Sequence, residues 1–185
     1  MSKAMQKPNI ILTGFMGTGK TTIGKRLAKE LSYNFIDTDV MIEKRAGRTI
    51  QKIFEELGES AFRKMESAVV SEIAGMQGQV IATGGRLMLD PGNAAALSQT
   101  GMVFCLVATA EEIFERVSKD NQNVRPLLAG EDPMARIVNL LEQRKDGYGR
   151  FSQIETSLKT PDEIVNILLA RFQIKFRSTI AHKRQ

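Results

Sequence analysis

The chain has 185 residues, of which 42% are hydrophobic and 25% are charged, and its formal net charge is +5. This length fits one domain with a single core, and the basic excess fits an anionic small ligand as well as it fits nucleic acid. The lone cysteine and lone histidine, Cys105 and His182, exclude an intramolecular disulfide and a zinc site of the Cys/His type, and no apolar run is long enough to span a membrane.

Short apolar runs alternate with helical patterns, which predicts an α/β protein with helices on both faces of a parallel sheet. Three nearly continuous apolar runs predict central strands at 9–14, 80–85 and 102–108. Weaker strand candidates lie at 34–39 and 153–157. The helical patterns fall at 21–31, 49–75 in one or two pieces, 110–119, 133–151 and 160–172.

Three further features mark the limits of these elements. Thr49 and Thr160 are predicted helix N-caps, and Pro161 follows Thr160 at the first-turn position. The polar segment 120–133, which contains Gly and Pro, is the one break long enough for a mobile loop. From about Gln173 the periodicity is lost and the chain ends basic, so we expect a frayed extension there.

A phosphate-binding motif follows the first predicted strand. Residues 14–21 have the sequence G-F-M-G-T-G-K-T, which matches G-x-x-x-x-G-K-[ST] between a strand and a helix. Such a loop wraps backbone N–H groups around a phosphate and points a helix N-terminus at it. Lys20 is expected to reach the outer phosphates of ATP, and the Thr21 hydroxyl to hold Mg²⁺. The predicted nucleotide contacts in this loop are Gly17, Thr18, Gly19, Lys20, Thr21 and Thr22.

The motif indicates a nucleotide but leaves open what is done with it. Small-molecule kinases, GTPase switches and larger ATP-driven machines all carry it. The chain contains no N-K-x-D tetrapeptide for recognising guanine, and it has no room for the oligomerisation or nucleic-acid module of a motor. The sequence therefore favours a small-molecule kinase.

Two carboxylates end the strand candidate F-I-D-T-D at 35–39. Asp37 and Asp39 are two residues apart and so point to one side, toward the carboxyl edge where open α/β sheets bind ligands. One carboxylate could lie in the shell of the magnesium ion, and the other could bind a substrate hydroxyl. The plainer interpretation is a turn with a helix cap.

Three arginines are further candidates, each with a plainer interpretation. Arg63 and Glu66 lie one helical turn apart on one face, as a surface ion pair worth well under about 1 kcal/mol would. Arg125 and Arg144 can equally be solvated basic side chains. Spacing alone does not bring Arg63, Arg144 and the glycines at 84–85 to one point.

Taken in order over about 10–172, these motifs resemble those of the shikimate kinases, small P-loop enzymes of the nucleoside-monophosphate-kinase type. The resemblance rests on G-F-M-G-T-G-K-T-T-I-G-K-R-L-A, T-G-G, V-R-P-L-L and R-x-x-x-Y, which begin at residues 14, 83, 124 and 144. Its most specific part lies at 35–66, where D-T-D is followed by I-E-x-x-x-G-x-[ST]-I-x-x-[IL]-F and then by F-R-x-x-E.

The resemblance implies transfer of the γ-phosphoryl group of ATP to the 3-hydroxyl of shikimate, in the biosynthesis of chorismate and the aromatic amino acids. By this resemblance Asp39 holds the shikimate hydroxyls and is the candidate base, and Asp37 lies near Mg²⁺. Arg63 and Arg144 are expected to clamp the shikimate carboxylate, a task that suits guanidinium forks. Glu66 would hold Arg63 in place.

The same resemblance implies a lid at about 119–133, where Arg125 would bring positive charge to the transferring phosphoryl group. Arg116 matches an adenine-stacking position, and Pro161 would lie near the adenine. The implied catalytic residues are Lys20, Asp39 and Arg125. The implied acceptor contacts are Asp39, Arg63, Gly84, Gly85 and Arg144.

For the whole chain, the expected fold is a three-layer α/β/α P-loop domain with a central parallel sheet of about five strands. One kinase domain is expected at 1–172, with substrate-binding helices at about 38–66, and a basic C-terminal extension at 173–185. We expect a cytoplasmic monomer that binds ATP and shikimate and neither nucleic acid nor membrane.

The chain departs from the family where the family usually has three glycines, because Arg86 follows Gly84 and Gly85. An arginine does not freely take positive φ, so a left-handed third position would require a different or strained loop. Three outcomes stay open for the arginine. Its side chain could turn outward, add a third positive group for the carboxylate, or fill the acceptor pocket and change the substrate.

Two rival functions remain at this point. Another small-metabolite kinase of the same fold, such as a gluconate-type kinase, would share the P-loop but not the set of Arg63, Arg144 and V-R-P-L-L. A nucleotide-binding regulator without turnover would instead use the basic tail H-K-R-Q on nucleic acid, with salt-sensitive binding.

Overall fold

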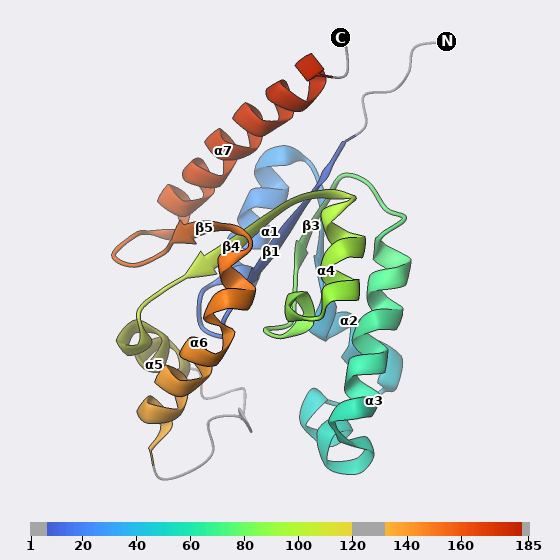
Figure 1. The fold of residues 1–185 in the computed structure, drawn as a ribbon, viewed down its shortest axis with the longest axis vertical. Coiled ribbons are helices and arrows are strands. Elements are labelled where there is room, and N and C mark those ends of the chain that lie inside the picture. The colour runs from blue at the N-terminus through green and yellow to red at the C-terminus, as the bar shows by residue number, and fades with distance from the viewer. Residues whose placement is uncertain (1–6, 120–131, 183–185) are drawn as a thin grey trace.

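Five strands form one parallel sheet in the order β2-β3-β1-β4-β5 (Figure 1). The computed structural model describes residues 7–119 and 132–182. The predicted five-stranded parallel sheet is confirmed, and the strand from 80 is shorter than predicted because it ends before the glycines. The strands are β1 (Asn9–Gly14), β2 (Asn34–Asp37), β3 (Gln79–Ala82), β4 (Gly101–Val107) and β5 (Ser152–Glu155).

Helices cover both faces of this sheet. The structure adds α4, which the sequence did not predict, and α7 continues past Gln173 to His182, where a frayed extension was expected. No Gly or Pro occurs within α7 after its first residue, so no helix-stopping signal interrupts it. The helices are α1 (Lys20–Leu31), α2 (Thr38–Ala46), α3 (Ile50–Ile73), α4 (Pro91–Ser98), α5 (Ala110–Ser118), α6 (Pro133–Gly149) and α7 (Pro161–His182), with a short 3-10 helix η1 (Leu87–Leu89).

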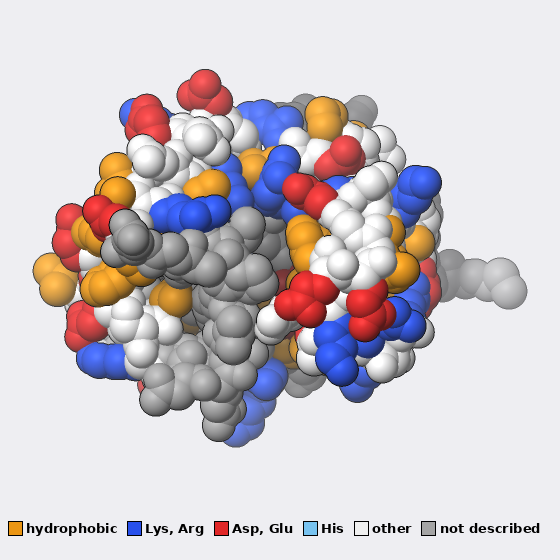
Figure 2. Space-filling model, turned by 90° about the horizontal axis from the view of Figure 1, so that it is seen from below, with side chains coloured by type: hydrophobic (Ala, Val, Ile, Leu, Met, Phe, Trp, Pro, Cys, Tyr) orange, Lys and Arg blue, Asp and Glu red, His pale blue; other side chains and the backbone are white. Residues whose placement is uncertain are grey.

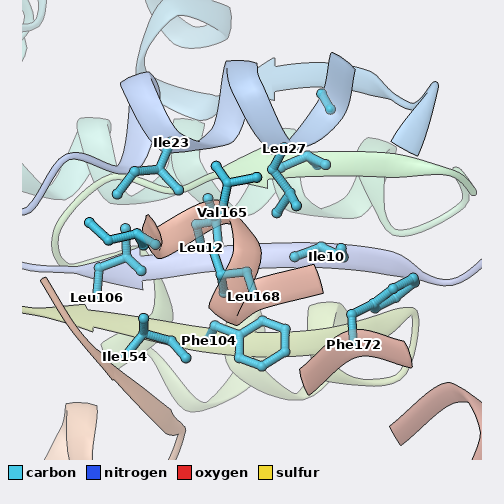
Figure 3. Packing of buried hydrophobic residues seen from close by; sticks show 13 residues of the cluster. Ile10, Leu12, Ile23, Leu27, Phe104, Leu106, Ile154, Val165, Leu168 and Phe172 are labelled. Carbon is cyan, nitrogen blue, oxygen red and sulfur yellow. The ribbon is translucent and has the colours of Figure 1, made fainter. Parts of the chain in front are cut away.

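The central strand β1 supplies side chains to two separate cores because successive residues point to opposite faces. Ile10 and Leu12 face α1 and α7, where Figure 3 shows Val165 and Leu168 of α7 over the sheet. Ile11 faces the other side and packs with residues of α2, α3 and α4. A third cluster, formed by Phe15, Cys105, Ile113, Ile137 and Tyr148, ties α5 and α6 to the end of the sheet.

Both predicted N-caps are present. Thr49 accepts a hydrogen bond from the Lys52 amide at 3.3 Å. Thr160 accepts one from the Glu163 amide at 3.3 Å, and the Glu163 carboxylate accepts the Thr160 amide at 2.7 Å, which completes a capping box.

The carboxyl ends of the strands meet at one edge of the sheet, as in other open α/β folds. This edge lies at the lower end of Figure 1, and Figure 2 views the molecule from that side, with basic and acidic side chains on both sides of the grey residues. Within the described residues, no helix is both long enough and apolar enough to cross a membrane. The loops at this edge hold the candidate active site.

Candidate active site

The loop between β1 and α1 is held in shape mainly by bonds to itself. The Thr18 hydroxyl donates to the Phe15 carbonyl at 2.8 Å. The Lys20 ammonium donates to the carbonyls of Gly14 at 2.9 Å and Phe15 at 2.7 Å. Gly19 caps α1 with φ 91°, a conformation that an L side chain rarely adopts. The result is a loop that directs the N-terminus of α1 at its own centre, which is the geometry of a phosphate-binding loop.

Asp37 connects this loop to the neighbouring strand. Its Oδ2 accepts the Thr21 hydroxyl at 2.8 Å, while its Oδ1 caps α2 by accepting the amides of Asp39 at 3.1 Å and Val40 at 3.4 Å. The helix-cap interpretation and the functional one are therefore compatible. Among the described residues, no three His, Cys, Asp or Glu side chains form a metal-binding group. A hydroxyl beside one carboxylate nevertheless fits Mg²⁺, which takes few protein oxygens and completes its shell with phosphates and water.

Asp39 occupies the most unusual electrostatic position. Its Oδ1 is buried and finds no hydrogen-bond partner among the described residues. Burial, followed by the negative charges of Asp37 and Glu66, raises the pKa of Asp39 to about 7, against the opposing charge of Lys20. A carboxyl group with such a pKa is half ionised near neutral pH and can accept a proton there.

The loop after β3 brings Gly84 close to two of these carboxylates. The Gly84 amide donates to the buried Thr38 hydroxyl at 2.9 Å. A Cβ on Gly84 would lie 2.5 Å from Asp39 Oδ1 and 3.1 Å from Glu66 Oε1, so only glycine fits at this distance. The absence of a side chain at this position is what allows Asp39 and Glu66 to converge.

Gly85, the next residue, faces a second group of side chains. Its carbonyl accepts the Tyr148 hydroxyl, and a Cβ at this position would be 3.8 Å from Arg144 Nη1. Arg144 is only 7% exposed, and its guanidinium lies over the Phe15 ring, 5.2 Å from the ring centroid. Arg144 is therefore a buried cation at the edge of the site and not the solvated side chain of the plainer interpretation.

Arg63 and Glu66 also form more than a surface ion pair. Arg63 Nη1 and Glu66 Oε2 are 2.5 Å apart, and the Glu66 side chain is 2% exposed whereas that of Arg63 is 30% exposed. Burial raises the pKa of Glu66, and the positive charge of Arg63 opposes this rise. A buried carboxylate thus holds a partly accessible guanidinium, whose Nε and Nη2 also donate to Glu59 Oε1 at 3.2 and 3.1 Å.

The structure answers the question raised by Arg86. Its φ is −109°, so this loop requires no left-handed conformation at the third position. The side chain is 48% exposed, and Nη1 donates to Glu59 Oε1 of α3 at 2.7 Å. Arg86 therefore points outward, and its side chain does not fill the acceptor side of the loop.

The remaining predicted residues lie on the nucleotide side or outside the described residues. Arg116 Nη1 donates to the Gly17 carbonyl and the Thr156 hydroxyl, each at 3.3 Å, so its guanidinium lies against the phosphate-binding loop. Pro161 opens α7 directly after the loop that follows β5. Arg125 and most of the predicted lid at 119–133 lie outside the described residues.

Sequence reasoning missed three side chains that shape this site. Thr38 holds Gly84 and Tyr148 holds Gly85, although both stand within the quoted motifs D-T-D and R-x-x-x-Y. Glu59 binds Arg63 and Arg86 together. The i,i+4 spacing of Glu59 and Arg63 could have indicated that pair, but nothing in the sequence could have identified the bond to Arg86, which is 27 positions away on a different element.

Comparison with known proteins gives one consistent family. The family model for shikimate kinase matches residues 16–173. A shikimate kinase from Caldanaerobacter subterraneus subsp. tengcongensis is 46% identical over 172 residues, covering 91% of this chain and 99% of that protein. A shikimate kinase from Acinetobacter baumannii, solved in complex with shikimate, superposes with a TM-score of 0.86 at 36% identity, covering 95% of this chain and 98% of the other. A gluconokinase from Sinorhizobium meliloti has a TM-score of 0.62 at 16% identity, covering 95% of this chain and 97% of that one, which shows a common fold alone.

Proposed function

This chain belongs to the shikimate kinase family, and we propose that it transfers the γ-phosphoryl group of ATP to the 3-hydroxyl of shikimate. The observation that carries the proposal is the convergence of Asp39, the Arg63–Glu66 pair and Arg144 around Gly84 and Gly85, beside a phosphate-binding loop. Because Glu66 is paired with Arg63, Asp39 remains for a hydroxyl and the two arginines for a carboxylate, which suits an acceptor that has both groups.

On the acceptor side, Arg63 and Arg144 bind the shikimate carboxylate, since planar guanidinium groups match a carboxylate better than ammonium groups do. Asp39 accepts the proton of the 3-hydroxyl group as the oxygen of that hydroxyl forms a bond to the γ-phosphorus of ATP. The bond from that phosphorus to the bridging oxygen breaks, and ADP leaves. The raised pKa of Asp39, about 7, supports this role because general bases work best when their pKa is near the working pH.

On the nucleotide side, the backbone amides of the loop and Lys20 hold the β- and γ-phosphates. Thr21 would hold Mg²⁺, with Asp37 acting indirectly through its bond to the Thr21 hydroxyl, and the ion would supply positive charge to those phosphates. Arg116 lies at the adenine, with Pro161 beyond it. Arg125 contributes positive charge from the lid. In this reaction the protein mainly positions the reactants and excludes water from the phosphate.

A coupled assay for ADP release tests the proposal. We expect saturable, ATP- and Mg²⁺-dependent turnover on shikimate and none on gluconate. Turnover on gluconate without turnover on shikimate would favour the rival small-metabolite kinase. The rival nucleotide-binding regulator would be favoured if the native chain showed no turnover and bound RNA or DNA in a salt-sensitive way that requires the C-terminal H-K-R-Q. The monomeric state, the cytoplasmic location and the lack of nucleic-acid or membrane partners stay predictions.

A further inference from the structure

Four charged side chains connect the loop after β3 to the acceptor side of α3. Glu59 Oε1 accepts Arg86 Nη1 at 2.7 Å, and the same oxygen accepts Arg63 Nε at 3.2 Å and Arg63 Nη2 at 3.1 Å. Arg63 Nη1 in turn bonds to Glu66 at 2.5 Å. Arg86, Glu59, Arg63 and Glu66 thus form one continuous chain of ion pairs, which we call the Arg86 relay.

Glu59 directly follows a kink in α3. Gly58, directly before it, has φ 79° and ψ 171° and interrupts the helix. A Cβ on Gly58 would meet no atom within 4 Å, so side-chain packing does not hold this point. Because Glu59 is itself 52% exposed, its orientation depends largely on the cations that bind it.

The Arg86 relay also determines which N–H donors of Arg63 remain for an acceptor. A guanidinium has five N–H donors. Three of them are used by Glu59 and Glu66, so among the described residues two donors on Nη1 and Nη2 remain for a carboxylate. If Glu59 moved, Glu66 would hold the guanidinium through Nη1 alone, and this pair of donors would be less firmly directed.

Charge balance supports the same assignment. Arg63, Glu59 and Glu66 together carry one net negative charge, which would oppose an anionic acceptor, and Arg86 brings the group to neutrality. The positive charge of Arg86 also reaches the interior of the site, since it lowers the pKa of Glu66 against the stronger effect of burial.

We propose that Arg86 is a positioning residue for acceptor binding, which acts through Glu59 to fix the guanidinium of Arg63. This inference rests on the proposed function, because it assigns Arg63 to the shikimate carboxylate. It gives a role to the residue at which this chain departs from its family. In this assignment Arg86 acts through its bond to Glu59 and not by contact with the acceptor.

Steady-state kinetics of a double-mutant cycle test the proposal. Arg86→Ala in the otherwise native chain should raise the KM for shikimate about two- to fivefold, the range expected for an exposed charge pair. The kcat and the KM for ATP should not change, because neither the base nor the nucleotide loop is affected. Arg86→Lys should restore part of the loss, since lysine keeps the charge but lacks the planar fork.

The decisive comparison uses Glu59→Gln, which removes the carboxylate charge and keeps the shape. In that background Arg86→Ala should leave the shikimate KM unchanged, because the group through which Arg86 acts has been removed. An equal rise of KM in both backgrounds would mean that Arg86 acts on acceptor binding independently of Glu59, and the proposal would be wrong.

Arg48→Ala is the matched control. Arg48 also pairs with a glutamate of α3, Glu56, and its side chain is 38% exposed, but it does not belong to the relay. It should leave the shikimate KM unchanged. If the native chain shows no turnover on shikimate, the proposed function fails at the first assay. If it turns over shikimate but the cycle shows no coupling between Arg86 and Glu59, only this inference fails.

Discussion

Two loops lie side by side at the carboxyl edge of the sheet, one after β1 and the other after β3, and they are stabilised in different ways. The loop after β1 is closed by Thr18 and Lys20, which bond to carbonyls only three to six positions away. The loop after β3 is held by Thr38 and Tyr148, which are 46 and 63 positions from their partners.

This difference shows which residues specify the nucleotide half of the site and which specify the acceptor half. The nucleotide half is local, so a short motif is enough to specify it. The acceptor half forms only when α2, α3 and α6 have packed against the rest of the fold. The affinity for the acceptor should therefore respond to changes on several elements. Asp37 is the link between the halves, because it bonds to Thr21 on one side and caps α2 on the other. The following four predictions test whether the halves can be separated.

The largest effect is expected for Asp39→Asn. This variant keeps the size of the side chain but cannot accept the proton, so kcat should fall by a factor of about 10² to 10⁴. The dissociation constant for ATP, measured by titration calorimetry, should stay close to that of the native chain. A marked loss of ATP affinity would assign Asp39 to the nucleotide half and would break the comparison.

Arg144→Lys should affect only the acceptor half. Lysine can keep the contact with Phe15 but cannot bind a carboxylate with two parallel bonds, so the shikimate KM should rise about 10- to 100-fold. The KM for ATP should be unchanged, and both constants come from the same coupled assay. Arg48→Lys serves as control for an arginine outside the site and should change neither. A rise in the KM for ATP would indicate that Arg144 contributes to both halves.

Thr21→Val should affect only the nucleotide half. Valine is close in shape to threonine but lacks the hydroxyl that bonds to Asp37, so the Mg²⁺ concentration for half-maximal rate should increase about tenfold. The shikimate KM at saturating Mg²⁺ should stay constant. If it rose instead, the bond between Thr21 and Asp37 would be needed to position α2, and the two halves would be coupled.

The smallest effect concerns the stability of the Asp39→Asn variant. The pKa of Asp39 is about 7 in the fold, raised from the ordinary 3.8 of an aspartate side chain, so the folded chain holds this proton over a pH range in which the unfolded chain has lost it. The native protein therefore loses stability as pH rises from about 4 to 7, and the asparagine variant does not. Its Tm should exceed that of the native chain by on the order of 5 °C at pH 8, and the difference should vanish toward pH 4.

Thermal unfolding followed by circular dichroism measures this difference. The exposed Asp146→Asn is the control and should show no such increase at pH 8. A lower Tm for the Asp39 variant at pH 8 would mean that Asp39 stabilises the fold when it is ionised, in contradiction to its raised pKa.

The sequence predicted what depends on neighbouring residues. The strands and most helices follow from periodicity, and both N-caps were identified. It did not predict α4, whose eight residues begin with Pro, Gly and Asn and show no strong apolar period, and which the Asp90 side chain caps. It also ended the last helix at 172, too early for α7, because the loss of an apolar period does not end a helix that has no stop signal.

The acceptor site could be named by resemblance but not assembled from spacing. Nothing in the sequence says that Glu66 is buried while Arg63, three positions earlier, is partly exposed. Nor does it say that the side chain of Arg86 would find Glu59. Such contacts depend on how α3 lies against the loop after β3, which is a property of the packed structure.

The backbone at Arg86 bears on how this loop varies during evolution. With φ at −109°, the third position does not require glycine, so its side chain can be exchanged without rebuilding the turn. Gly84 lacks this freedom, because a Cβ there would lie 2.5 Å from Asp39 Oδ1. A signature that demands glycine at the first position and not at the third would therefore recover more divergent relatives than one that demands all three. The third position is where a lineage can acquire a new side chain by a single mutation.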